Sequence, residues 1–418
     1  MTPQGARRVA IVMHGFSGGG MERSMLRLAE AFLARGLAVD FVVGQAKGEL
    51  LGEVPAGARI VPLTKTPVFW TTARARVLVA QPSAWKFMLR PRDEIKAVKP
   101  LLRWLPCLID HLRRARPDAV LAAEPRYNLL AIWGSRLSGL GARVLVSERI
   151  HVSRHAEGDR WWADPSLRDL LRSAYLKADA IVAVSDGVAD DLAAHAGIPR
   201  ARITTVCNPV VGPELLAKAA QEPDHPWLAP GEPPTLLAVG RLHPQKDFPT
   251  LIRAFARIRA KRAVRLLILG GSSPITPGHA AELTTLVGDL GVADDVAMLG
   301  YADNPFAYMS RASVFVLSSL YEGLPGVLIQ ALACSCPVVS TDCPSGPREI
   351  LDHGRFGPLV PVGDDAALAR AIEDTLDDPP PAELLRGRAG LFSVDRAVDG
   401  YLRLLLPAGE KLPGQAAA

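Results

Sequence analysis

Short apolar runs alternate with amphipathic helical patterns along almost the whole of this 418-residue chain. This alternation is typical of parallel α/β sheets, in which a helix follows each buried strand and crosses back over the sheet. The chain is too long for one ordinary domain and suits two. The sequence therefore predicts two doubly wound α/β domains that face each other, with a ligand cleft at the carboxyl ends of their strands.

Twelve strands and five clear helices are predicted. In the first half, the strands are residues 9–14, 38–44, 58–63, 119–123, 143–147, 180–185 and 203–206. In the second half, they are residues 235–239, 265–269, 296–299, 313–317 and 337–341. The clearest helices are residues 22–35, 129–138, 250–260, 280–290 and 327–333.

A proline-rich break near the middle of the chain separates the two predicted domains. We place an N-terminal domain at residues 1–211, a linker at 212–234 and a C-terminal domain at 235–393. Residues 394–418 are expected to form a C-terminal helix that packs back on the N-terminal domain and ends in a frayed tail.

Composition excludes several classes of protein. No run of about 18 apolar residues occurs, which argues against a membrane span. The apolar run 9–13 is too short for the core of a signal peptide, so a cytoplasmic location is expected. The five cysteines lack zinc-ribbon spacing, and Cys334-x-Cys336 has no second pair, which favours buried reduced thiols over a metal site.

The net charge of +5 is unevenly spread. Residues 1–150 carry 23 Lys and Arg against 11 Asp and Glu, and most of this excess lies in 65–116, among Trp70, Trp85, Phe87 and Trp104. Cations and tryptophans beside an apolar stretch suit an anionic membrane surface. A solvated helix face with core aromatics explains the same pattern. Nucleic acid is disfavoured because no helix-turn-helix, zinc or RNP pattern accompanies the charge.

A glycine-rich loop follows the first predicted strand. His14 ends the strand, and Gly18, Gly19 and Gly20 precede Glu22 at the start of a helix. Adjacent glycines let a ligand approach the backbone closely, and a helix N-terminus attracts an anion. A plain strand–turn–helix connection fits the loop equally well.

Two cations follow the first strand of the second half. Arg241 and Lys246 come directly after Gly240, where a bidentate guanidinium and a point-charge ammonium suit a diphosphate. Two solvated charges in a loop are the alternative.

The segment 313–333 is the most informative of the chain. A strand ends, Glu322 stands in the turn, and the Gly-Leu-Pro-Gly elbow 323–326 starts a helix. Glu322 can accept hydrogen bonds from sugar hydroxyls, and the first helical N–H groups can bind phosphate oxygens. Gln330 lies one helical turn further on, within reach of a ribose.

This stretch resembles the E-x7-E signature of glycosyltransferase family 4, the retaining nucleotide-sugar enzymes of the GT-B fold, in which two Rossmann-like domains face a central cleft. The resemblance extends to the Gly18–Glu22 loop, Asn128, the Ser147-Glu148-Arg149 stretch, Gly240-Arg241-x4-Lys246 and the run 342–349. The last run looks like bacterial members that extend lipid-linked glycans, capsule, O-antigen or lipopolysaccharide core.

The resemblance implies a role for each matching position. The catalytic residues would be Glu322, Arg241, Lys246 and His14. The donor would be bound by Gly18, Gly19, Gly240, Leu324, Pro325, Gly326, Val327, Gln330 and Tyr301. Asn128, Glu148, Arg149 and His151 would lie on the acceptor side. No metal or other cofactor is expected, because the chain lacks an Asp-x-Asp pair and the nucleotide-sugar is itself a substrate.

The sequence departs from the family pattern at two positions. Gln330 stands where the second Glu would accept both ribose hydroxyls, which would cost about 1–2 kcal/mol of donor affinity. Ser335 stands where Gly is frequent. A non-catalytic partner protein with a weakened donor site is therefore an alternative, and a nucleotide-sugar epimerase or a phosphorylase is another.

The expected function is retaining, metal-independent hexosyl transfer to a glycan or lipid-linked acceptor in cell-surface polysaccharide synthesis. UDP is favoured over GDP, while the sugar, acceptor and linkage are left open. A lipid-linked acceptor would give the basic region 65–116 a purpose, as a peripheral contact with the inner face of the membrane. No nucleic-acid partner is expected.

Overall fold

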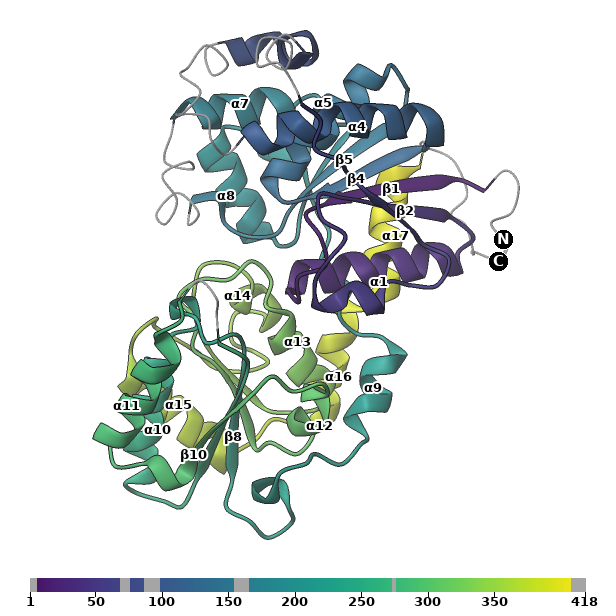
Figure 1. Ribbon diagram of the computed structural model, residues 1–418. Helices are drawn as coiled ribbons and strands as arrows, with labels where there is room; N and C mark the ends of the chain where they lie inside the picture. The colour runs from purple at the N-terminus through teal and green to yellow at the C-terminus, as the bar shows by residue number, and fades with distance from the viewer. Residues whose placement is uncertain (1–5, 68–75, 86–97, 154–164, 273–275, 407–418) are drawn as a thin grey trace. The chain divides into compact units, whose positions relative to one another are not determined.

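A computed structural model describes residues 6–67, 76–85, 98–153, 165–272 and 276–406 (Figure 1). The chain divides into two compact units. Unit 1 comprises Met1–Pro209 and Val394–Ala418, and unit 2 comprises Val210–Ser393. Each unit contains one parallel sheet with helices on both faces, which confirms the predicted α/β class. The predicted frayed tail lies outside the described residues.

The sheet of unit 1 has the strand order β3-β2-β1-β4-β5-β6-β7. Its strands are β1 Arg8–Met13, β2 Ala38–Val43, β3 Arg59–Pro62, β4 Ala119–Ala123, β5 Arg143–Glu148, β6 Ala180–Ala183 and β7 Ile203–Thr205. The order runs outward in both directions from the β1–β4 pair. In open α/β sheets, the carboxyl edge at such a switch point is the usual place for a ligand.

Helices cover both faces of this sheet. They are α1 Gly20–Ala34, α4 Lys99–Ala115, α5 Pro125–Ser138, α7 Pro165–Tyr175, α8 Asp186–Ala196 and α17 Val394–Leu405. Figure 1 shows α1 and α17 on one face and α4 and α5 on the other. The C-terminal helix α17 thus belongs to unit 1, although unit 2 precedes it in the chain.

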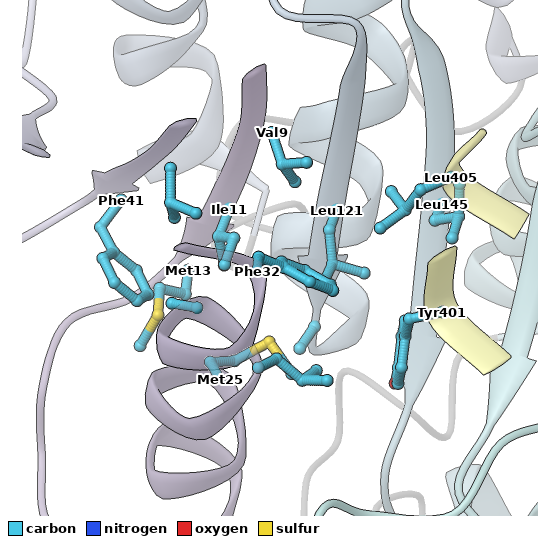
Figure 2. Close-up of a cluster of buried hydrophobic side chains, with 14 of the residues drawn as sticks. Val9, Ile11, Met13, Met25, Phe32, Phe41, Leu121, Leu145, Tyr401 and Leu405 are labelled. Atoms are coloured by element: carbon cyan, nitrogen blue, oxygen red, sulfur yellow. The ribbon is translucent and has the colours of Figure 1, made fainter. Parts of the chain in front are cut away.

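One core of unit 1 lies between the sheet and α1 (Figure 2). Alternate residues of a strand point to the same face, so Val9, Ile11 and Met13 of β1 all enter this core. Phe32 of α1 and Tyr401 of α17 close it, and all five side chains are buried. Hydrophobic burial therefore fixes α17 to unit 1.

The sheet of unit 2 has the strand order β10-β9-β8-β11-β12-β13. The strands are β8 Thr235–Val239, β9 Arg265–Leu269, β10 Val296–Gly300, β11 Val314–Leu317, β12 Val338–Thr341 and β13 Leu359–Val360. The helices are α9 Pro213–Ala219, α10 Phe248–Arg259, α11 His279–Asp289, α12 Pro305–Met309, α13 Gly326–Ala333, α14 Pro347–Ile350, α15 Asp365–Asp377 and α16 Ala382–Ala389. All the predicted strands are present, and only β13 was not predicted, because two residues are too short for a periodic pattern.

The segment 212–234, described above as a linker, is folded onto unit 2. It contains α9 and makes side-chain contacts with the α12 region. Asn304 donates a hydrogen bond to the carbonyl oxygen of Lys218 over 2.9 Å, and Arg311 pairs with Glu222 at 2.6 Å. The structural division of the chain comes instead between Pro209 and Val210.

The basic region 65–116 is only partly covered by the structure, because Trp70 and Phe87 lie outside the described residues. The apolar stretch of this region, residues 104–109, is packed largely inside unit 1 and is not open to a membrane. Trp104 is 4% exposed and stacks on Tyr127 inside unit 1, with ring centroids 5.9 Å apart. Val79 and Trp85, by contrast, are 73% and 52% exposed. No helix in the described part of the chain has both the length and the apolar character needed to span a membrane.

The five cysteines are free thiols. Cys334, Cys336 and Cys343 are buried, and burial raises the pKa of Cys334 to about 12. Cys107 and Cys207 are partly exposed, so the expectation of burial holds for three of the five. Among the described residues, no three His, Cys, Asp or Glu side chains cluster as a metal site would require.

Candidate functional site

The loop after β8 brings Gly240 and Lys246 together. Lys246 ends the short 3-10 turn Pro244–Lys246 and extends over Gly240, where an added Cβ would meet Lys246 Cε at 3.1 Å. Gly270, at the end of β9, has φ +150°, and a Cβ there would lie 1.8 Å from the Gly240 carbonyl oxygen. Glycine at position 270 therefore lets two strand-end loops approach each other closely.

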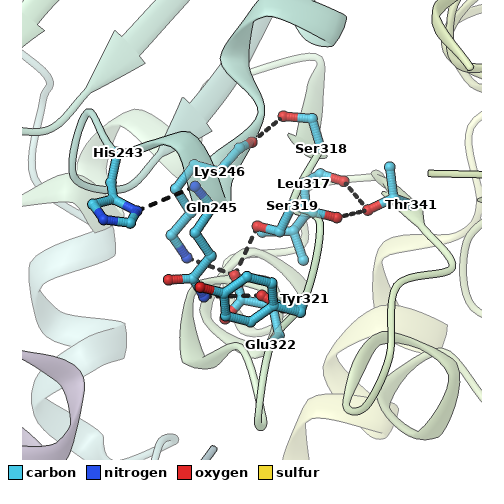
Figure 3. A network of polar contacts seen from close by, with 9 residues as sticks. All are labelled: His243, Gln245, Lys246, Leu317, Ser318, Ser319, Tyr321, Glu322 and Thr341. Carbon is cyan, nitrogen blue, oxygen red and sulfur yellow. Dashed lines mark hydrogen bonds and ion pairs between the residues drawn. The ribbon is translucent and has the colours of Figure 1, made fainter. Parts of the chain in front are cut away.

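Lys246 and Glu322 form an ion pair at the carboxyl edge of this sheet. Lys246 Nζ donates to Glu322 Oε1 over 2.6 Å, and Ser319 Oγ donates to the same oxygen over 2.7 Å (Figure 3). The two charged side chains are only 20% and 10% exposed. The structure thus brings together two residues that the sequence analysis placed in the same site.

Further hydrogen bonds join the strand-end loops around this pair. Ser318 Oγ donates to the Lys246 carbonyl oxygen over 2.7 Å, and Gln245 Nε2 donates to the Tyr321 carbonyl oxygen over 2.9 Å. Thr341 Oγ1, at the end of β12, donates to the Ser319 carbonyl oxygen over 2.7 Å (Figure 3). Each charged side chain is therefore held by a loop that hydrogen-bonds to its neighbour.

The elbow that leads into α13 is held by a close backbone approach. Gly346 has φ +84°, and a Cβ there would lie 2.4 Å from Pro325 Cδ. Pro325 is the N-cap of α13 and provides no side-chain acceptor. The first N–H groups of α13, at Gly326 and Val327, lack an intrahelical acceptor, as at any helix N-terminus, and Leu324 is buried behind them. Such N–H groups suit a phosphate.

Three other predicted donor-side residues lie around this edge. Arg241 is exposed directly after the loop glycine, and Gln330 is partly exposed on α13. Tyr301 is 62% exposed and follows β10, two strands away from β8. The structure places Tyr301 at the same edge of the sheet, because parallel strands end on one side.

In unit 1, His14 follows β1 and contacts α5. Its Nδ1 lies 2.7 Å from the Tyr127 hydroxyl, and burial lowers the pKa of His14. A Cβ at Gly44 would lie 2.9 Å from the same hydroxyl. The glycine at position 44 therefore leaves room for the His14–Tyr127 contact.

The predicted glycine loop lies beside a buried acid. Ser17 Oγ donates to Glu22 Oε1 over 2.8 Å, and a Cβ at Gly19 would meet Glu22 Oε2 at 2.5 Å. Gly18 has φ +34°, and a Cβ there would meet Glu49 Oε2 at 2.3 Å. The loop therefore needs its glycines for the approach of carboxylates of unit 1, whatever else it binds.

Asn128 and Glu148 form a buried network beneath this edge. Asn128 Nδ2 donates to Glu148 Oε1 over 3.0 Å, and the Tyr175 hydroxyl donates to the same oxygen. Burial raises the pKa of Glu148 to about 8. Because Asn128 is 0% and Glu148 is 1% exposed, neither side chain is accessible to an acceptor. Both residues were predicted on the acceptor side, and their burial puts them beneath the surface of unit 1 at this edge.

Arg149 and His151 are also held by unit 1. Arg149 Nη1 donates to the Tyr401 hydroxyl of α17 over 3.3 Å. His151 Nδ1 lies 3.3 Å from Asp191 Oδ1. Burial by itself would raise the pKa of Asp191, but hydrogen bonds from His151 and Ser153 hold it at about 2. The carboxylate therefore stays ionised and fixes the start of the loop that follows β5.

Sequence reasoning missed Glu124, which directly follows β4. Its φ is +82°, and burial together with the nearby charge of Glu22 raises its pKa to about 7. The only signal in the sequence was an acid placed between a predicted strand and Pro125.

A cavity of about 400 Å³ opens elsewhere in unit 1. Its lining includes Arg7, Arg116 and Arg143, which lie at or just before the amino ends of β1, β4 and β5. It therefore lies at the edge opposite His14 and is separate from the residues described above.

Two glycosyltransferase profiles match the two halves of the chain. The profile of Glycosyltransferase Family 4 matches residues 18–211, and that of Glycosyl transferases group 1 matches residues 233–378. Together they cover most of the chain.

Two curated relatives were compared. The N-acetylgalactosamine-N,N'-diacetylbacillosaminyl-diphospho-undecaprenol 4-alpha-N-acetylgalactosaminyltransferase of Campylobacter jejuni is 33% identical over 50% of this chain and 54% of its own length. The matched stretch thus spans about half of that protein. The lipopolysaccharide core biosynthesis glycosyltransferase LpsE of Rhizobium meliloti is 29% identical over 72% of this chain and 79% of its own length.

A solved structure shares the fold. The Anabaena protein Alr3699/HepE, crystallised with UDP and glucose, superimposes with a TM-score of 0.71 at 16% identity, over 96% of this chain and 99% of that one. The two Rossmann-like units are those of the GT-B fold. The chain carries a Glycosyltransferase Family 4 region in its first half and a Glycosyl transferases group 1 region in its second, and these two regions identify it as a glycosyltransferase.

Proposed function

We propose that the chain transfers a sugar from a nucleoside diphosphate sugar to a glycan or lipid-linked saccharide, in the synthesis of a cell-surface polysaccharide. The observation that carries the proposal is the Lys246–Glu322 pair at the carboxyl edge of unit 2. Four residues after Glu322 in the chain, α13 begins at Gly326, and its first N–H groups have no side-chain cap. A cation, a carboxylate and unpaired amides together match the diphosphate and the hydroxyls of one donor molecule.

The proposed chemistry is electrostatic. Lys246, Arg241 and the first amides of α13 neutralise the charge that develops on the leaving diphosphate, which is usually the largest catalytic contribution. Glu322 accepts hydrogen bonds from the hydroxyls of the transferred sugar. The transfer retains the anomeric configuration by attack from the leaving-group side, and the leaving phosphate takes the proton of the acceptor hydroxyl. No metal ion is required.

UDP is the proposed leaving group. The structural relative Alr3699/HepE was crystallised with UDP and glucose, and with UDP-glucose. Gln330, one turn into α13, is the side chain that would meet the ribose. A neutral amide there gives weaker hydrogen bonds than a carboxylate.

The proposed acceptor is lipid-linked, because the Campylobacter relative is named for a diphospho-undecaprenol substrate. The enzyme then works at the inner face of the membrane. Val79 and Trp85 are the exposed apolar side chains of the basic region that suit such a surface. Gln81, between them, is buried and bonded to Trp133 and Ser173, so this segment is anchored to unit 1. Co-sedimentation with anionic vesicles at low salt, weakened in Trp85→Ala, is the expected result.

Thermal shift with UDP, GDP, ADP and CMP in the presence of EDTA tests the donor site. UDP should raise the Tm of the wild type, and Lys246→Ala should abolish the rise. The matched control is Lys218→Ala, because Lys218 also pairs with a glutamate at 2.6 Å in unit 2 but lies on α9. If no nucleotide shifts the wild type at millimolar concentration, the chain is the non-catalytic partner that Gln330 suggests.

A further inference from the structure

Glu124 and His14 follow the neighbouring strands β4 and β1 at the switch point of the unit 1 sheet. In the β1–β4 pair, Val12 is level with Ala122. His14 comes two residues after Val12, and Glu124 comes two residues after Ala122. The two residues therefore follow adjacent strands at the same edge of the sheet. Ligands of open α/β sheets bind at this kind of position. The location alone makes Glu124 as well placed as His14 to meet a substrate.

The backbone at Glu124 is unfavourable for a residue with a side chain. Its φ is +82° and its ψ is 138°, a region that glycine enters freely and other residues rarely adopt. Such conformations persist where the surrounding structure imposes them, and they cluster at functional sites.

The carboxylate of Glu124 accepts no hydrogen bond from the described residues. Glu124 is the N-cap residue of α5, a position where Ser, Thr, Asp or Asn usually accepts a hydrogen bond from the first turn of the helix. Here no such bond forms. Among the described residues, nothing else donates to this carboxylate either, and His14 Nε2 is likewise without a partner. Two polar groups at the ends of adjacent strands are thus left available.

The surrounding charges indicate which ligand group fits. The negative charge of Glu22 opposes ionisation of Glu124, whereas the positive charge of Arg126 favours ionisation of Glu124. A second carboxylate beside Glu124 makes this edge a poor place for a phosphate. A neutral hydroxyl suits it, because carboxyl oxygens accept hydrogen bonds and a protonated carboxyl also donates one. Since burial raises the pKa of Glu124 to about 7, both forms exist near neutrality.

We propose that Glu124 is a substrate-binding residue of unit 1 whose carboxyl group hydrogen-bonds a hydroxyl of a sugar. This inference rests on the proposed function. The sugar is either the acceptor or the one being transferred, and both offer the same chemistry.

The test combines stability, nucleotide binding and activity. The variants are Glu124→Gln, which keeps the shape, Glu124→Gly, which suits the backbone, and Glu30→Gln as a control on the exposed face of α1. Each is measured for its Tm, for its Tm shift with UDP, and for restoration of cell-surface polysaccharide in cells whose own copy of the gene is deleted.

A substrate-binding role predicts a specific combination of results. Glu124→Gly should raise the Tm by about 2–4 °C, because it relieves the backbone and removes a carboxyl next to Glu22. Glu124→Gln should keep the UDP shift of the wild type and restore less than a tenth of the polysaccharide. A structural role would instead lower the Tm of both Glu124 variants, and that result would overturn the inference. Full restoration of the polysaccharide by Glu124→Gln would also overturn it.

Release of UDP by the purified protein, with water in place of the acceptor, identifies the sugar. The donors are UDP-glucose, UDP-galactose and UDP-N-acetylgalactosamine. If Glu124 holds the transferred sugar, Glu124→Gln slows this release at least tenfold; if it holds the acceptor, release is unchanged while polysaccharide is lost. Normal polysaccharide in the deletion cells would contradict the proposed function itself, whereas restoration by wild type and Glu124→Gln alike contradicts only the inference.

Discussion

Lys246 Nζ lies 2.6 Å from Glu322 Oε1, although the two residues are 76 positions apart in the chain. They come from loops that follow two different strands, β8 and β11, which are neighbours in the sheet of unit 2. Without a donor, the cation and the carboxylate satisfy each other. In the proposed function, a diphosphate sugar draws Lys246 toward phosphate while Glu322 exchanges the ammonium for sugar hydroxyls.

A double-mutant cycle on Lys246→Ala and Glu322→Ala should give a coupling energy of about 0.5–3 kcal/mol in the free energy of unfolding. The pair is largely buried, so either single variant leaves one charge poorly solvated. Urea denaturation of the four proteins measures the coupling. The control cycle is Lys218 and Glu214, an exposed helical pair for which about 0.3–0.5 kcal/mol is expected. Equal coupling in the two cycles would mean that burial adds nothing to the Lys246–Glu322 contact.

Gln330→Glu should tighten UDP binding about 5- to 30-fold, since a carboxylate accepts charge-assisted hydrogen bonds from both ribose hydroxyls. Isothermal titration calorimetry of UDP measures the change. Gln330→Ala provides the reference for removal of the side chain and should bind more weakly than wild type. Weaker binding by Gln330→Glu than by wild type would show that the ribose is not at this position.

Glu148→Gln should change how stability depends on pH. The folded protein holds a proton on Glu148 up to about pH 8, whereas the unfolded chain releases it near pH 4.5. The free energy of unfolding of the wild type therefore falls as pH rises from 4.5 to 8, by about 1.4 kcal/mol per unit from this group. Glu124 adds a second, similar contribution up to about pH 7.

In Glu148→Gln the pH-dependent loss of stability caused by Glu148 is absent. The free energy of unfolding of the variant should therefore be close to that of the wild type at pH 5 and higher at pH 8. Urea denaturation at both values measures this, with exposed Glu53→Gln as the control. Parallel profiles for wild type and Glu148→Gln would mean that Tyr175 and Asn128 keep Glu148 ionised despite its burial.

Ser335→Gly should stabilise unit 2 relative to Ser335→Ala by about 1 kcal/mol. Ser335 follows α13 with φ +63°, and the N–H groups of Ser335 and Cys336 donate to Leu332 and Ala331 in the hydrogen-bond pattern that favours glycine. Both variants lose the contact of the Ser335 hydroxyl with Arg386. Their difference in Tm therefore reports only the cost of placing a residue with a Cβ at a positive φ. Identical Tm values would contradict it.

The linear sequence determined the strand–helix alternation, because each β-strand and helix has its own local hydrophobic period. It also determined the loops that carry Gly240, Lys246 and Glu322, since parallel strands end at one edge and residues just after them must lie there. For the same reason the placement of His14 at the corresponding edge of unit 1 was predictable.

Only the tertiary structure decided burial and partners. Asn128 and Glu148 match a family motif, yet packing of α5 on β5 and of α7 on α5 removes them from solvent. The apolar side of α4 looked suited to a membrane but packs against α5, and Glu124 gained its unusual backbone and its neighbour Glu22 from contacts between separate elements. Hydrophobic period and loop position are local properties of a chain, whereas desolvation and the pairing of distant charges depend on which surfaces come together.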